Sequence, residues 1–68
     1  MMNNFIVYVA NVGTEYRGTD GKRAMKEYTD CVKLSIEDHG MWGGQSVMLY
    51  CNGEIIAEHE GRFEDENE

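Results

Sequence analysis

The pattern of hydrophobic and polar positions changes its period along the chain. Residues 5–10 read Phe-Ile-Val-Tyr-Val-Ala, a run of β-branched and aromatic residues that predicts a strand. The continuous apolar character of this run favours a central position in a sheet. After a turn at residues 11–13, residues 14–17 alternate weakly and predict a short second strand.

Residues 20–37 show the period of a helix. Seven residues recur at three- and four-residue spacing and predict one buried stripe: Ala24, Met25, Tyr28, Cys31, Val32, Ser35 and Ile36. Thr19 or Asp20 is expected to cap the first turn, because short polar side chains accept hydrogen bonds from the free N–H groups there. Gly40 can take the left-handed conformation that often ends a helix.

The last third of the chain predicts a β-hairpin. Residues 45–51 and 54–60 are strand-like, and Asn52-Gly53 between them is typical of a two-residue turn with positive φ at both positions. Such a turn fixes the register, so we expect Leu49 to pair with Ile56. One face should then carry Val47, Leu49, Cys51 and Ile56, and the other should carry Met48, Tyr50, Ile55 and Ala57.

These elements predict an α+β fold, a three- or four-stranded antiparallel sheet with one helix packed on one face, in the order β-(β)-α-β-β. Residues 1–62 form the expected single domain, and residues 63–68 form an acidic C-terminal tail. The second sheet face is also apolar, with Tyr8 or its neighbours added from the first strand, although one helix covers only one face. Either Arg62 and Phe63 fold back over this face, or another chain covers it, for example in a homodimer.

The charge is strongly acidic and unevenly placed. The 68 residues carry 13 Asp and Glu against 6 Lys and Arg, for a formal net charge of −7. Residues 1–36 hold four acidic and five basic residues, whereas residues 37–68 hold nine acidic residues and one basic residue. This balance argues against direct binding of nucleic acid or an anionic membrane. The acidic end is either a solvated tail after the last strand or an acidic surface that meets a protein partner with a basic surface.

Candidate catalytic chemistry is sparse. Ser35, Ser46, His39 and His59 form no recognisable set of nucleophile, base and orienting group, and no pair has the spacing of a metal site. We therefore expect no enzyme activity, no catalytic residue, no metal and no cofactor. Cys31 and Cys51 lie in apolar contexts and are expected to be reduced, mostly buried thiols.

The candidate partner-binding residues are Glu54, Glu58, Glu60 and Glu64, with Trp42 as an apolar anchor. The glutamates of the returning strand should be held more rigidly than the tail, which lowers the entropy lost on binding. Trp42 lies between Met41 and two glycines and has two interpretations. It either folds back to cap the core, or it is an exposed anchor of the kind that dominates interfaces.

In size, strand–helix–hairpin order and excess acid, the chain resembles the small acidic accessory proteins with which bacteriophages disable or redirect host machinery, such as anti-CRISPR proteins. The hairpin reads Val-Met-Leu-Tyr-Cys-Asn-Gly-Glu-Ile-Ile-Ala-Glu over residues 47–58. The resemblance implies a non-catalytic inhibitor that binds a host or defence protein in the bacterial cytoplasm. Two alternatives remain at this point, a small homo-oligomeric assembly protein and a binder that sequesters a nucleotide-type ligand.

Overall fold

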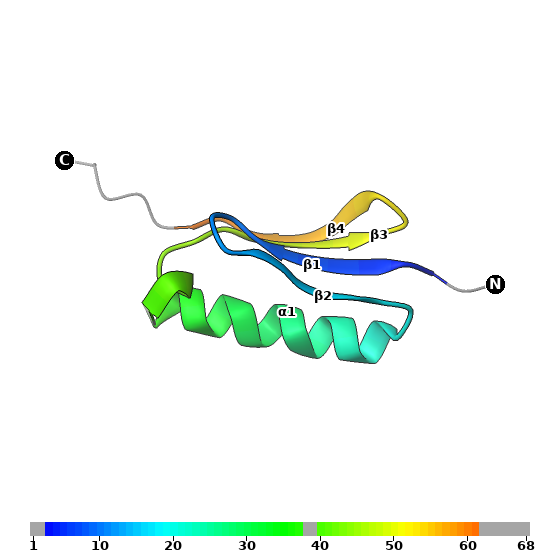
Figure 1. Ribbon diagram of the computed structural model, residues 1–68, viewed down its shortest axis with the longest axis horizontal. Coiled ribbons are helices and arrows are strands. Elements are labelled where there is room, and N and C mark those ends of the chain that lie inside the picture. The colour runs from blue at the N-terminus through cyan, green and yellow to red at the C-terminus, as the bar shows by residue number, and fades with distance from the viewer. Residues whose placement is uncertain (1–2, 38–39, 62–68) are drawn as a thin grey trace.

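The computed structural model describes residues 3–37 and 40–61. Along the chain the elements are β1 (Phe5–Val9), β2 (Gly13–Gly18), α1 (Gly21–Ile36), the 3₁₀ turn η1 (Gly40–Trp42), β3 (Val47–Cys51) and β4 (Glu54–His59). The four strands form one antiparallel sheet in the order β2-β1-β3-β4, and α1 lies along one face of it (Figure 1). The α+β prediction is confirmed, with four strands.

The core lies between α1 and the two central strands. Val7 and Val9 of β1 and Val47 and Leu49 of β3 are fully buried. Because side chains alternate across a strand, the residues between them point to the other face, which α1 does not cover (Figure 1). α1 packs mainly against β1, β2 and β3. β4 lies at the edge of the sheet and has few contacts with α1.

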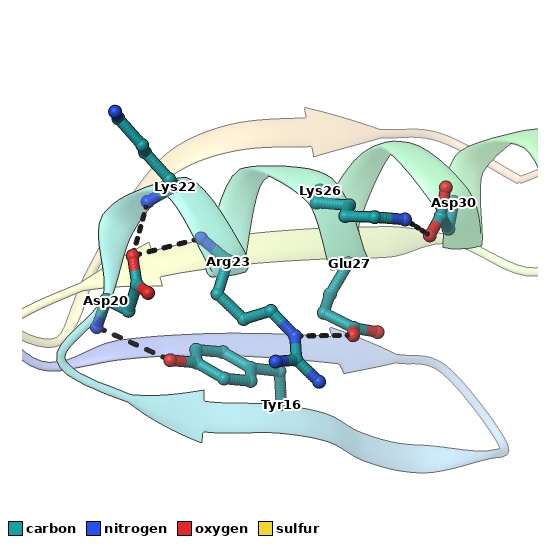
Figure 2. Close-up of polar contacts among 7 residues, drawn as sticks. All are labelled: Tyr16, Asp20, Lys22, Arg23, Lys26, Glu27 and Asp30. Carbon is teal, nitrogen blue, oxygen red and sulfur yellow. Dashed lines mark hydrogen bonds and ion pairs between the residues drawn. The ribbon is translucent and has the colours of Figure 1, made fainter.

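The first turn of α1 is fixed by Asp20, one of the two caps that the sequence offers. Asp20 has an extended backbone, and its carboxylate accepts hydrogen bonds from the N–H groups of Lys22 (3.0 Å) and Arg23 (3.2 Å) (Figure 2). These N–H groups have no partner inside the helix, so the Asp20 carboxylate supplies the hydrogen-bond acceptor that the helix backbone lacks there.

The buried stripe of α1 is narrower than predicted. Ala24, Cys31 and Ser35 are buried, but Met25 and Ile36 are 50% and 59% exposed. Each residue turns the helix by about 100°, which places Met25 and Ile36 at the margin of the stripe rather than in it. The prediction that these two residues are buried was wrong.

The hairpin turn forms as its sequence predicts. Asn52 and Gly53 have φ values of 53° and 87°, both in the left-handed region. The side chain of Asn52 also ties the turn to the start of the chain, because its Oδ1 accepts a hydrogen bond from the Asn4 N–H (2.9 Å). The tip of the hairpin is thereby held beside β1.

The register of the hairpin differs from the prediction beyond its first two pairs. Tyr50 pairs with Ile55 as expected, but Leu49 pairs with Ala57 and not with Ile56, because β4 carries a β-bulge. One extra residue in a strand moves every later side chain to the other face. Ala57 therefore lies on the helix side of the sheet, and Ile56 is left 54% exposed.

Candidate functional site

Three of the predicted partner-binding glutamates lie on or beside β4. Glu54, Glu58 and Glu60 are all exposed, and β4 forms one edge of the sheet. Glu64 lies outside the described residues. We call Glu54, Glu58 and Glu60 the acidic edge. Residues 47–61 contain no Lys or Arg, so no positive charge of this segment offsets these carboxylates.

The acidic edge does not lie on one face of the sheet. Glu54 pairs with Cys51 on the helix side, whereas Glu58 pairs with Met48 on the opposite side. Regular alternation along β4 predicts that Glu54 and Glu58 project together, but this prediction is wrong, because the bulge between them reverses the alternation. A partner that contacts both carboxylates must therefore approach the free edge of β4 and not a flat face.

Basic side chains gather on another part of the molecule, the first turns of α1. Arg23 is paired with Glu27 and Lys26 with Asp30, each over 3.1 Å and one helical turn apart (Figure 2). The Arg23 guanidinium also lies 6.0 Å from the ring centre of Tyr16 on β2. These are exposed ion pairs, worth about 0.3–0.5 kcal/mol each.

The charge of Glu58 also acts on α1. Burial raises the pKa of the Tyr28 phenol, and the negative charge of Glu58 raises it further. Both effects disfavour the phenolate, so Tyr28 stays neutral at physiological pH. The charge of Glu58, at the edge of the sheet, therefore reaches Tyr28 on α1.

Trp42 is separated from the acidic edge. It is half-buried and packs against the core, and its Nε1–H donates a hydrogen bond to Glu15 Oε2 on β2 over 3.1 Å. β2 and β4 are opposite edges of the sheet. Of the two interpretations of Trp42, this placement fits the one in which the indole caps the core, and the structure does not group it with the glutamates.

The face of the sheet opposite α1 is the second candidate surface, and we call it the open face. Eight residues of the four strands point to it by register: Thr14 and Arg17 of β2, Ile6 and Tyr8 of β1, Met48 and Tyr50 of β3, and Ile55 and Glu58 of β4. A shallow hollow of about 290 Å³ on this face is lined by Ile6, Tyr8, Tyr50 and Gly53. The sequence predicts most of this apolar face but not the position of Arg17, because only the pairing of Arg17 with Ile6 shows on which face Arg17 lies.

A smaller hollow of about 150 Å³ lies on the helix side, lined by Ser35, Ile36, His59 and Glu60. The buried Ser35 hydroxyl donates a hydrogen bond to the Gln45 carbonyl oxygen over 2.7 Å. This contact joins the end of α1 to the segment that enters β3. Its role is structural, because the hydroxyl hydrogen is donated to a backbone carbonyl oxygen.

Both cysteines are free thiols. Cys31 is buried, and burial raises its pKa to about 11, with the charges of Glu15, Glu27 and Asp30 acting in the same direction. Cys51 is only half-buried, so the expectation of burial is confirmed for Cys31 and only partly for Cys51.

Among residues 3–37 and 40–61, no three His, Cys, Asp or Glu side chains are grouped as metal ligands. Over the same part of the chain, no helix has the length and apolar character needed to cross a membrane. Comparisons with protein-family models, with curated proteins and with solved structures found no match to this chain.

Proposed function

We propose that this protein is a non-catalytic binding protein that inhibits a host or defence protein, as phage accessory proteins do, and that it contacts a basic surface through the acidic edge. The observation that carries the proposal is the exposure of Glu54, Glu58 and Glu60 along a free edge strand. Their backbone is held by the β3–β4 ladder over residues 54–59, which limits the entropy lost on binding.

The position of these carboxylates at an edge also suits approach by a charged partner. Complementary charge speeds the encounter of two proteins more than it strengthens the final complex. The paired bases of α1 do not neutralise the acidic edge, because Arg23 and Lys26 are already bonded to Glu27 and Asp30. Among residues 3–37 and 40–61, no ion pair involves the acidic edge, so a basic partner meets a negatively charged edge there.

The test is capture of partners from bacterial lysate on the immobilised chain, followed by mass spectrometry, at low and at high salt. A basic protein should be enriched on the wild type, released by salt and lost from the Glu54→Lys/Glu60→Lys variant. Glu27→Lys/Asp30→Lys is the matched control, since it changes the net charge equally on α1. Equal capture of the same partner by both double variants would contradict the proposal.

A further inference from the structure

The open face has the composition of an interface. Its centre is formed by Ile6 and Tyr8 of β1 and by Met48 and Tyr50 of β3, and Tyr8 is 38% exposed. An antiparallel sheet that faces water on one side normally carries polar residues there. A contiguous apolar patch with polar residues at its rim marks a surface that binds another molecule.

The rim of this face carries opposite charges on its two edges. Arg17 is on the edge strand β2, opposite Ile6, and Glu58 is on the other edge strand β4, opposite Met48. Both side chains are exposed and neither is on the helix side. The open face therefore runs from a positive edge, across an apolar centre, to a negative edge.

We propose that a second copy of this chain covers the open face, in a face-to-face dimer whose twofold axis runs parallel to the strands. A dimer with twofold symmetry uses the same patch on both copies, so the patch must be complementary to itself. Rotation about an axis along the strands reverses the order β2-β1-β3-β4 and lays β2 of one copy over β4 of the other. Arg17 of each copy then lies over β4 of the other copy, one residue pair along the strand from Glu58, on both sides of the dimer.

The same rotation matches the apolar centre. β1 of one copy lies over β3 of the other, so Ile6 faces Tyr50 and Tyr8 faces Met48. Contacts of a methionine sulfur with an aromatic ring are favourable. Packed sheets lie about 10 Å apart. Arg17 is level with Ile6, whereas Glu58 is level with Tyr8, two residues further along the strand. The Arg17 and Glu58 side chains are long enough to span both this offset and the distance between the sheets.

Two other ways of pairing the chain are less favourable. Joining two β4 strands edge to edge brings the glutamates of both acidic edges together, and the bulge in β4 interrupts the regular ladder that such pairing needs. A twofold axis across the strands lays each strand over its own copy. Arg17 then lies beside the second copy's β2 and has no Glu58 to meet.

The dimer does not depend on the proposed function. Glu58 belongs both to the acidic edge and to the rim of the open face, so the partner test changes only Glu54 and Glu60, which the dimer does not use. A negative result in one test therefore does not contradict the other proposal.

Analytical ultracentrifugation over a concentration series tests the dimer by charge exchange. The wild type should dimerise, and Arg17→Glu and Glu58→Arg should each raise the dissociation constant by about tenfold or more, because like charges then lie close together across the interface. The double variant Arg17→Glu/Glu58→Arg should return the constant to within about threefold of wild type. Lys33→Glu, an exposed change on α1, is the charge-matched control for Arg17→Glu and should have no effect.

A second pair of variants tests the apolar centre. Tyr8→Ser should weaken the dimer, whereas Met25→Ser, at an exposed apolar residue of α1, should not. Circular dichroism shows whether each variant is folded. If a charge-reversal variant does not fold, Arg17→Gln or Glu58→Gln takes its place. A wild type that stays monomeric at all concentrations overturns the proposal. Single charge reversals that leave the dissociation constant unchanged also overturn it, as does a double variant that fails to restore association.

Discussion

Leu49 of β3 lies opposite Ala57 of β4, and the residue before Ala57 is the extra residue of the bulge. Leu49 is fully buried, whereas Ile56 is 54% exposed. Two aliphatic side chains of equal size, one strand apart, therefore have different surroundings. The small Ala57 occupies the position beside the core that a regular hairpin would give to Ile56.

This difference predicts unequal costs of truncation. Leu49→Ala should lower the free energy of unfolding by about 3 kcal/mol, because it removes buried methyl groups and leaves a cavity. Ile56→Ala should cost less than about 1 kcal/mol, since much of its side chain is already in water. Urea unfolding followed by circular dichroism measures both values. Equal losses from the two substitutions would mean that Ile56 is in the core and that the bulge is absent.

The cap of α1 gives a second prediction. Asp20→Ala should lower the free energy of unfolding by about 1 kcal/mol, because the N–H groups of Lys22 and Arg23 lose their acceptor. Asp20→Asn keeps an acceptor oxygen and should cost less. Asp30→Ala, which removes only an exposed ion pair with Lys26, is the control and should cost about 0.5 kcal/mol or less. If Asp20→Ala lowers the free energy of unfolding by no more than this control, the cap does not stabilise the folded protein.

A third prediction concerns the hydrogen bond between Trp42 and Glu15. Glu15→Ala leaves the half-buried indole N–H without its acceptor and should lower the free energy of unfolding by about 1 kcal/mol. Trp42 is the sole tryptophan, so its fluorescence reports this site directly. The emission maximum should move to longer wavelength in Glu15→Ala and much less in Glu15→Gln. An unchanged spectrum in Glu15→Ala would show that the contact does not hold the indole in place.

The raised pKa of Cys31 predicts a loss of stability at alkaline pH. The folded chain holds the thiol proton up to about pH 11, whereas the unfolded chain releases it near the ordinary value of 9.0. The stabilising contribution is therefore complete below pH 9 and is lost as the pH rises to about 11. Urea unfolding in reducing buffer at pH values across this range should show the fall.

The control for this prediction is Cys31→Ala, which cannot ionise at that position. Its free energy of unfolding should fall less steeply over the same pH range, and the remaining slope should include the contribution of Tyr28, whose pKa is raised as well. In the native wild type, Cys31 should also react with a thiol reagent more slowly than the half-buried Cys51. Identical pH profiles for wild type and Cys31→Ala would contradict this account.

The sequence by itself determined the elements and their order. The apolar run at residues 5–10, the helical period from residue 20 and the Asn52-Gly53 turn are local signals, and each gave the correct element in the structure. The two candidate surfaces were also partly visible in advance, because Glu54, Glu58 and Glu60 follow the turn and Met48 and Tyr50 alternate with core residues.

Tertiary structure alone decided which faces these residues take. The bulge in β4 places Glu54 and Glu58 on opposite sides of the sheet, and pairing with β1 places Arg17 on the open face. The hydrogen bond to Glu15 draws Trp42 toward β2 and away from the acidic edge. Alternation within a strand is a local property, but a bulge, a strand neighbour and a contact between residues 27 positions apart depend on segments that meet only when the chain folds.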